Sequence, residues 1–294
     1  MKIAVTYAPH LAPWFSDVAF ATSMALAELG HSVELTPCKS LSGFNVSDRD
    51  LIFVIAPHGY QENQQSFVKN PNKRYVCWDL EQTPFREQIN AITSKRFERT
   101  LEYFGKYDFF FTEAETKAEY FRQQGYPAHC LNFGYHPHYT KQVAGDKEYD
   151  IFFVGIMFPR RAAILQQLMA AGLTLYPATG NFFDPVQKAI AINSSKICLN
   201  IHHNDMPYFE KPRIIQDIMA NDGFCLTEII AYPEDFKHGE HFIMAEYSAL
   251  VETAIEWSKK DDERKEIARN GLKFLATEYR AANFLEEMIR IVNG

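Results

Sequence analysis

Short apolar runs rich in β-branched and aromatic residues recur through the first half of the chain, each about as long as one strand. The first run, "KIAVTYA", precedes a helical pattern at 16–30, with Ser16 as the predicted N-cap and Gly30 as the predicted C-cap. Strands that are apolar throughout are typical of a parallel sheet buried on both faces. The pattern therefore predicts a doubly wound α/β unit with strands at 2–8, 31–38, 50–57, 74–80, 107–114 and 127–134.

The pattern is interrupted at 135–149, where proline, glycine and mixed charges predict a linker between domains. A second α/β series follows and ends in helices, so we expect two α/β units in tandem. The length of 294 residues is about twice that of a usual domain and agrees with this division. The predicted strands are 150–156, 173–178, 195–203, 223–228 and 241–246, and the predicted helices are 160–172, 213–221, 248–260, 261–279 and 281–294.

Composition and charge narrow the class of protein. The net charge of −7 argues against a non-specific nucleic-acid binder, but not against an acceptor carried on a nucleic acid. Five scattered cysteines without a CxxC pair indicate reduced thiols in a cytoplasmic protein. The N-terminus has a strand pattern rather than a signal peptide, and no apolar run reaches the ~18 residues of a membrane span. We therefore expect a cytoplasmic protein.

Polar residues follow the predicted strands of the first unit, at the edge where open parallel sheets bind ligands. The first loop has no GxGxxG, which removes the main support for a dinucleotide-binding enzyme. His10 and His58 lie just past strand ends and either bond to the backbone or act as a general base or sugar contact. Glu81 and Gln82 either begin a solvated helix or contact an acceptor, and Glu81 is a further candidate base.

The sequence predicts no catalytic metal. The aspartates of "SDRD" (47–50) precede a strand, whereas the carboxylates of a DxD metal motif follow one. The histidines of "HPHY" (136–139) and "IHH" (201–203) lack the spacing and the partner ligands of a zinc site.

Two segments of the second half place positive charge at a predicted helix start. In "FVGIMFPRRAAI", Gly155 ends a strand, and Arg160 and Arg161 open a helix. Cations at that position oppose the helix dipole, so an anion shared with the backbone NH groups is a natural partner. The alternative is two surface arginines.

The segment "EKPRIIQDIMANDG" begins with Lys211, Pro212 and Arg213 near free backbone donors, which predicts a diphosphate site. Asp217 lies about one turn further on, where a carboxylate can accept from both hydroxyls of a ribose. The alternative is that the two cations are solvated and Asp217 pairs with a neighbouring helix.

The second half resembles the GT-B-fold glycosyltransferases, in particular the family 1/4-like, spore-maturation-type group. Five segments carry the resemblance, in family order over about 149–280: "YDIFFVGIMFPRRAAILQQL", "SKICLNIHH", "KPRIIQDIMANDGFCLTE", "FKHGEHFIMAEYSALVETAIEW" and "DDERKEIARNGLKFLATEY". In the first half, "WDLEQTPF" and "YDFFFTEAETKAEYFRQQGYPAHCLNFGYHPHY" look like the end of that family's acceptor domain and its hinge. The resemblance is weakest over 1–72.

The resemblance implies two Rossmann-like domains facing across a cleft. Residues 1–140, joined by a C-terminal helix at 282–294 that crosses back, would bind the acceptor. Residues 148–281 would bind a nucleotide-diphosphate sugar, with UDP, GDP or dTDP as its nucleotide. Its implied donor-binding residues are Gly155, Arg160 and Arg161 on the phosphate side, Lys211 and Arg213 on the diphosphate, Asp217 on the ribose, Thr227 and Glu228 at the edge, and also His202 and Glu210.

The chain departs from the family at one motif. Related retaining enzymes carry two glutamates separated by seven residues, whereas Glu210 and Asp217 have six residues between them. The ribose role of Asp217 survives the change to aspartate, while the departure puts the sugar-contact role of Glu210 in question.

The resulting hypothesis is metal-independent transfer of a sugar from a nucleotide-diphosphate donor to a hydroxyl of a glycan, protein, small molecule or modified nucleobase. Arginine, lysine and helix-terminus NH groups would stabilise the leaving diphosphate. An inverting reaction would need a base, with His10, His58 and Glu81 as candidates; in a retaining reaction the leaving phosphate can take the proton. Two alternatives are a nucleotide-sugar epimerase or hydrolase of the same fold and a non-catalytic nucleotide-sugar-binding protein.

Overall fold

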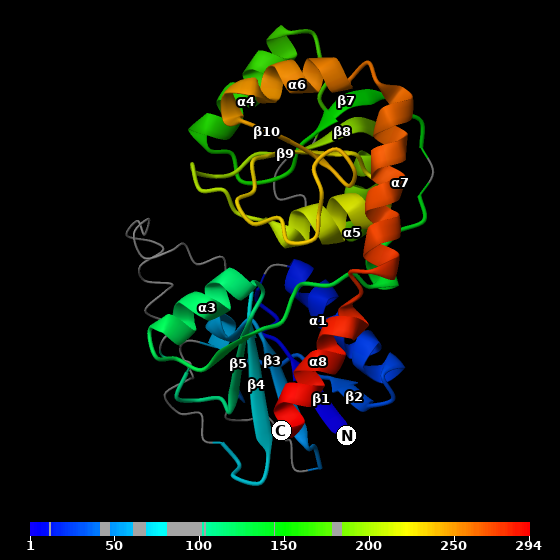
Figure 1. Cartoon of the computed structure of the whole chain (residues 1–294). Coiled ribbons are helices and arrows are strands. Elements are labelled where there is room, and N and C mark those ends of the chain that lie inside the picture. Colours follow the sequence, from blue (N-terminus) through cyan, green and yellow to red (C-terminus); the bar gives the residue numbers. More distant parts are fainter. Residues whose placement is uncertain are drawn as a thin grey trace. The chain divides into compact units, whose positions relative to one another are not determined.

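The computed structural model describes residues 1–11, 13–41, 48–60, 69–80, 102, 104–143, 145–177 and 184–294. The chain divides into two compact units, each built on a parallel sheet (Figure 1). Unit 1 is Met1–His136 together with Ala281–Gly294, and unit 2 is Pro137–Arg280. Within the ranges given above, no helix is long and apolar enough to cross a membrane.

The sheet of unit 1 has the strand order β2-β1-β3-β4-β5-β6, and every pairing is parallel. The chain starts in the interior of the sheet and winds first to one edge and then to the other, as predicted for a doubly wound unit. All five residues of β3 are buried, which is expected for a strand covered on both faces. The strands are β1 (Lys2–Thr6), β2 (Ser32–Leu35), β3 (Leu51–Ile55), β4 (Arg74–Asp79), β5 (Phe109–Thr112) and β6 (Ala128–Cys130).

Helices cover this sheet. The C-terminal helix α8 (Ala281–Asn293) packs beside α1 (Pro13–Glu28), although the two are far apart in the sequence (Figure 1). Alternate residues of the strands form a core cluster with Ala118 and Phe121 of α3 (Glu115–Gln123). The C-terminal helix thus belongs to unit 1, as the resemblance implies.

Backbone and side-chain bonds hold α8 in place. The NH of Ala281 donates to the carbonyl oxygen of Tyr135 (2.7 Å). At the other end, Arg74 Nη1 donates to the carbonyl of Val292 (2.6 Å) and to Oδ1 of Asn293 (3.0 Å). Gly134 permits this approach, because a Cβ at that position would lie 2.5 Å from the Cα of Ala281.

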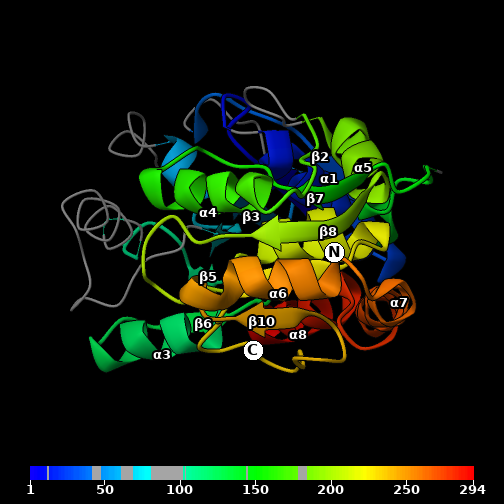
Figure 2. The same ribbon diagram turned by 90° about the horizontal axis from the view of Figure 1, so that it is seen from above.

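Unit 2 has a sheet of order β10-β9-β8-β7, again with parallel pairings only. The strands are β7 (Tyr149–Phe152), β8 (Ser195–Asn200), β9 (Cys225–Glu228) and β10 (Ile243–Ala245). Figure 1 shows α4 (Pro159–Ala170) and α6 (Leu250–Trp257) together on one face of this sheet. Seen from above in Figure 2, the same two helices flank β8. The other helices of unit 2 are α5 (Pro185–Asn193) and α7 (Asp261–Thr277), with a short 3-10 helix η7 (Tyr247–Ala249) before α6.

The structure corrects four secondary-structure predictions. The strand predicted at 173–178 is a single bridge between Leu175 and Ile151, and Pro177 has no NH with which to extend a ladder. The helix predicted at 213–221 is a π-helical segment, η5 (Pro212–Ile218), followed by a 3-10 turn, η6 (Met219–Asn221). Helix α5 was not predicted, although Asp184 caps it by accepting from the NH of Gln187.

The fourth correction concerns the start of α1. The helix begins at Pro13 rather than after Ser16, and the Ser16 hydroxyl donates to the carbonyl of Pro13 instead of capping the helix. Proline fits the first turn because its missing NH would have no partner there.

We expect Gly134→Ala to lower the free energy of unfolding of unit 1 by about 1–3 kcal/mol, since the added methyl group would force α8 outward. Chemical denaturation followed by circular dichroism measures this change. Gly105→Ala is the matched control, because nothing lies within 4 Å of a Cβ at that position. Equal unfolding midpoints for the two variants would contradict the close approach of α8.

Candidate donor site

The carboxyl ends of β7, β8 and β9 in unit 2 meet at one edge of the sheet, where open parallel sheets bind their ligands. Asn200 ends β8 and pairs in register with Thr227, one residue before the end of β9. Gly155 follows β7, and Arg160 and Arg161 lie in the first turn of α4, which comes next in the chain. Parallel winding thus gathers several of the predicted site residues at this edge.

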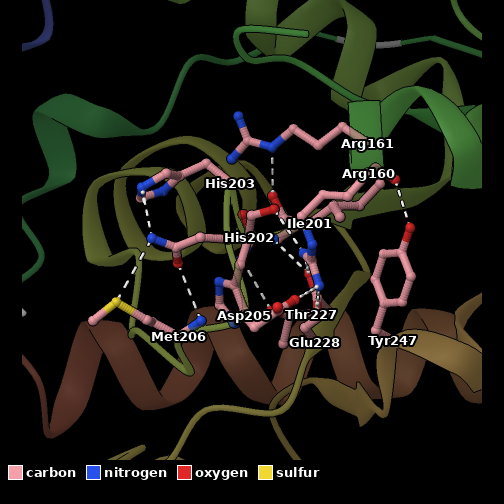
Figure 3. Close-up of polar contacts among 12 residues, drawn as sticks. Arg160, Arg161, Ile201, His202, His203, Asp205, Met206, Thr227, Glu228 and Tyr247 are labelled. Atoms are coloured by element: carbon pink, nitrogen blue, oxygen red, sulfur yellow. Dashed lines mark hydrogen bonds and ion pairs between the residues drawn. The ribbon is translucent and has the colours of Figure 1, made fainter. Parts of the chain in front are cut away.

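Arg160 is fixed by contacts inside unit 2. Its guanidinium makes two hydrogen bonds to the Glu228 carboxylate (2.7 and 3.0 Å), and Nη1 also donates to the carbonyl of His202 (2.8 Å). Asp205 is the third residue that accepts from this guanidinium, at 3.2 Å, and the guanidinium lies 4.1 Å from the ring centre of Tyr247 (Figure 3). Burial alone would lower the pKa of Arg160, but the bond to Glu228 and its charge raise it. These contacts make Arg160 the counter-ion of Glu228.

Arg161 leaves α4 in a different direction from Arg160 (Figure 3). Its Nε donates to the carbonyl of Ile201 (2.8 Å) and its Nη1 to the carbonyl of Ile156 (3.0 Å). The residue is only 3% exposed. Burial and then the charge of Arg213 lower the pKa of Arg161 to about 10, so it remains charged at neutral pH. Neutral carbonyls therefore accept the hydrogen bonds of Arg161 without compensating its charge.

Arg213 is held by a chain of side chains that starts in β9. Thr227 Oγ1 accepts from Asn200 Nδ2 (3.0 Å), and Asn200 Oδ1 accepts from Arg213 Nη1 (3.1 Å). Thr227 and Asn200 are fully buried. The Thr227 hydroxyl thereby turns the amide of Asn200 so that its oxygen faces the arginine. Thr227 thus positions Arg213 through Asn200.

The two guanidinium groups meet beside Gly155. A Cβ at this glycine would lie 3.0 Å from Nη2 of Arg213 and 3.2 Å from Nη1 of Arg161. Gly155 also has a φ of 151°, a conformation that side chains disfavour. The glycine therefore lets the backbone approach two like charges at once, and we call Gly155, Arg161 and Arg213 the arginine pair site.

Glu210 is the carboxylate beside this site. Its oxygens lie 3.6 Å from Arg161 Nη2 and 3.8 Å from Arg213 Nη1, too far for hydrogen bonds. Burial alone would raise the pKa of Glu210, but Arg213, His202 and Arg161 lower it to about 2. One ionised carboxylate thus faces two guanidinium groups, and the site keeps a net positive charge that suits an anion.

Lys211 and Asp217 form ion pairs of their own. The ammonium group of Lys211 bonds to the carboxylate of Glu234, which also accepts from the hydroxyl of Tyr279. Asp217 pairs with Lys188 of α5, the neighbouring-helix arrangement that the sequence analysis left open. Lys211 is 1% exposed. The structure therefore brings Arg161, Arg213, Gly155 and Glu210 together, while Lys211 and Asp217 are held by other partners.

Two of the candidate bases of unit 1, His10 and His58, follow different strands of its sheet. His10 is exposed in the loop after β1, and His58 follows β3 and lies 5.5 Å from the ring of Phe15. Glu81 lies outside the residues that the structure describes. Among the residues that the structure describes, there is no group of three or more His, Cys, Asp or Glu side chains that could hold a metal ion.

Asn200 and the carbonyls of Ile156 and Ile201 were not among the predicted site residues. A polar residue at the end of the apolar run "SKICLN" was a signal for Asn200, because it stands where strands of a parallel sheet reach the ligand edge. Backbone carbonyls leave no mark in the sequence, so the two that hold Arg161 could be found only from the structure.

Comparisons with known proteins agree with this architecture. Residues 161–290 match the family model described as "Glycosyl transferase-like". No curated protein sequence matches the chain. An alpha-glucosyltransferase in complex with UDP and a 13-mer DNA containing a HMU base is similar in structure, with a TM-score of 0.68, 11% identity and coverage of 100% of this chain and 99% of that chain.

Two further structures are similar. HepE of Anabaena in complex with UDP-glucose has a TM-score of 0.64 and 10% identity, with 100% of this chain and 99% of that chain covered. TarM of S. aureus has a TM-score of 0.60 and 11% identity, with 83% of this chain covered. The chain spans 55% of the length of TarM. At these identities the similarity establishes the fold.

The fold is therefore GT-B: two α/β units, each with a parallel sheet, and a C-terminal helix that belongs to the first unit. The GT-B fold that the resemblance implies is thereby confirmed. Arg161 and Arg213 of the arginine pair site lie within the matched residues 161–290, and Gly155 lies in the loop before them.

We expect Arg160→Gln to lower the free energy of unfolding of unit 2 by about 3 kcal/mol, because it leaves the buried Glu228 carboxylate without its counter-ion. Chemical denaturation measures the loss, and adding Glu228→Gln should restore part of it. Arg269→Gln is the matched control: this exposed arginine bonds to the carbonyl of Lys265 in its own helix, and its loss should cost under about 0.5 kcal/mol. Equal losses for Arg160→Gln and Arg269→Gln would refute the structural role of Arg160.

Proposed function

We propose that the protein is a glycosyltransferase that moves a sugar from a nucleoside diphosphate sugar to a hydroxyl of an acceptor. The observation that carries the proposal is the arginine pair site, where two guanidinium groups face one glycine at the ligand edge of a parallel sheet. Such an arrangement suits a diphosphate, whose two phosphates can accept from both arginines and from nearby backbone NH groups.

The charges support departure of a diphosphate. Breaking the bond between sugar and phosphate leaves negative charge on the phosphate oxygens, and preorganised guanidinium groups stabilise that charge. Arg161 is held by carbonyls and Arg213 by Asn200. Both guanidinium groups are therefore in place before the nucleotide sugar binds. We propose that this positive charge replaces the metal that other transferases use.

The remaining donor contacts are assigned from the resemblance. Asp217, balanced by Lys188, would accept from the ribose hydroxyls, and Lys211 would add positive charge near the start of η5. HepE and the alpha-glucosyltransferase were solved with UDP-glucose or UDP, which favours UDP as the nucleotide here. We propose unit 2 (Pro137–Arg280) as the donor domain and unit 1 as the acceptor domain, with His10, His58 or Glu81 as the base if the reaction inverts.

Nucleotide release from UDP-, GDP- and dTDP-glucose, measured with and without candidate hydroxyl acceptors, tests the proposal. Release that depends on an acceptor supports transfer. Release or isomerisation without an acceptor would instead identify an epimerase or hydrolase, and thermal stabilisation without turnover would identify a binding protein. We expect excess EDTA to leave the rate unchanged; a loss that Mg²⁺ or Mn²⁺ restores would overturn the metal-independent part.

We expect Arg213→Ala to lower kcat/KM by about ten- to a hundredfold, because it removes charge-assisted hydrogen bonds to the leaving diphosphate. The unfolding midpoint should remain close to that of the wild type, since Arg213 is partly exposed and its partner Asn200 keeps its bond to Thr227. The control is Arg269→Ala, which should leave kcat/KM unchanged. A wild-type kcat/KM in Arg213→Ala would contradict the assignment of Arg213 to a diphosphate site.

A further inference from the structure

Three apolar residues in succession are exposed in the loop between β7 and α4. Ile156, Met157 and Phe158 are 68%, 55% and 37% exposed. This loop adjoins the arginine pair site, because Arg161 Nη1 donates to the carbonyl of Ile156 (3.0 Å). Contiguous apolar surface beside a few well-placed polar groups is typical of a ligand-binding site.

Phe158 stands at a position where an aromatic side chain does nothing for the helix. It is the N-cap of α4, with φ −100° and ψ 158°, and its side chain makes no capping hydrogen bond. Serine, threonine, asparagine and aspartate are preferred at an N-cap because their side chains accept from the free backbone NH groups. The extended conformation that Pro159 requires of the residue before it is open to most side chains. The start of α4 therefore gives no reason for a ring at this position.

The Phe158 ring belongs to a row of rings that begins at Arg161. The guanidinium carbon of Arg161 lies 5.7 Å from the centre of the Phe158 ring, and that ring lies 6.0 Å from the ring of His203. His203 in turn stacks on Tyr208, with ring centres 6.0 Å apart and planes at 8°. We call Phe158, His203 and Tyr208 the aromatic row. It joins the loop after β7 to the loop after β8, at the ligand edge of the sheet.

Hydrogen bonds within the loop after β8 hold the far end of the aromatic row. Asn204 Nδ2 lies 3.1 Å from His203 Nε2, and Asn204 Oδ1 accepts from the NH of Met206 at 3.1 Å (Figure 3). The hydroxyl of Tyr208 donates to the sulfur of Met206 (3.0 Å). The rings behind Phe158 are thus fixed before a ligand binds, which lowers the entropy that binding would cost.

The covalent structure of a nucleotide sugar decides which of its parts reaches the aromatic row. The sugar is bonded directly to a phosphate oxygen, whereas the base is separated from the phosphates by the ribose. A phosphate oxygen that accepts from Arg161 lies about 2.7–2.9 Å from the guanidinium nitrogen. The group bonded to that phosphate therefore lies beside Phe158. The proposed function assigns the ribose to Asp217, which pairs with Lys188 on a different element, α5.

The chemistry of a sugar ring suits this surface. A pyranose carries hydroxyl groups around its rim and C–H groups on its faces. The face of an aromatic ring is the negative part of its quadrupole, so it attracts the weakly positive C–H hydrogens and also excludes water from an apolar face.

We propose that the aromatic row is the subsite for the transferred sugar, and that this sugar is a pyranose whose C–H face packs on the ring of Phe158. This inference rests on the proposed function. The arginine pair site selects the diphosphate, whereas Phe158 contacts only the sugar and so contributes to the choice of sugar.

Isothermal titration of the full chain with UDP and with UDP-sugars separates the two contacts. UDP-glucose, UDP-galactose and UDP-N-acetylglucosamine all carry a pyranose, and the one that binds the wild type most tightly is used. Phe158→Ser should raise the Kd of that UDP-sugar by about two- to tenfold, since one aromatic contact is lost. The Kd of UDP should stay unchanged. Serine is chosen because it is a favourable N-cap, so α4 should keep its stability.

Two further variants are matched controls. Phe158→Tyr keeps the ring and should bind the UDP-sugar as the wild type does. Met169→Ser removes another exposed apolar side chain (52% exposed), in the last turn of α4, and should change neither Kd. If the nucleotide-release assay selects GDP or dTDP, the matching nucleotide and nucleotide sugar are titrated instead. Phe158→Ala decides if the serine variant does not fold.

An equal rise in the Kd of UDP and of the UDP-sugar in Phe158→Ser would overturn the inference, because the ring would then contact the nucleotide or only position Arg161. An unchanged Kd for both ligands would overturn it as well, as would a wild type that binds UDP and none of the three UDP-sugars. These outcomes leave the proposed function standing. Failure of the UDP-, GDP- and dTDP-sugars alike to bind would instead overturn the proposed function, and this inference with it.

Discussion

Repulsion between two guanidinium groups is the constraint around which the carboxyl edge of unit 2 is arranged. The nearest nitrogens of Arg161 and Arg213 both approach the position of a Cβ on Gly155, at 3.2 and 3.0 Å. Two nitrogens that close to one point are at most about 6 Å apart, and two unit charges at that separation repel by roughly 3 kcal/mol at an effective dielectric constant of 20. The fold has to supply contacts that hold both groups there without cancelling the charge that an anion requires.

Those contacts are mostly neutral. Arg161 donates to two backbone carbonyls, and Arg213 donates to an amide oxygen that is oriented by Thr227. Neutral acceptors satisfy the donor hydrogens of a guanidinium and leave its net charge intact. Glu210 is the exception, and its distances of 3.6 and 3.8 Å make it a counter-ion that a phosphate can replace without first breaking a hydrogen bond.

The two adjacent arginines of α4 show how a helix start can separate structural and ligand-binding roles. Arg160 is bound by the Glu228 carboxylate through two hydrogen bonds, so its charge is used within the protein. Arg161 points to carbonyls and keeps its charge for a ligand. The sequence "PRR" could not distinguish them, because the difference depends on which strand ends lie beside each side chain.

What could be predicted from the sequence depends on whether a feature arises from a local pattern or from contacts between distant residues. Apolar periodicity identified both parallel units, because a strand buried on both faces has a continuous apolar run whatever its partners are. The resemblance to GT-B transferases, not periodicity, assigned Gly155, Arg161 and Arg213 to one donor site, and parallel strands that end together explain why their loops share an edge. The pairing of Asp217 with Lys188 and of Lys211 with Glu234 depends on contacts between residues distant in sequence, which periodicity does not determine.

Glu234 shows how such a distant contact bears on the site. It is a non-glycine residue with a φ of 55°, a left-handed conformation that costs on the order of 1 kcal/mol. Its carboxylate binds Lys211, at the start of η5, and Tyr279, just beyond the end of α7. These two bonds offset the strain and fix Lys211, the N-cap residue directly before the segment that carries Arg213. The position of one member of the arginine pair site therefore depends on a strained residue of a loop that follows β9, in addition to the strand ends beside it.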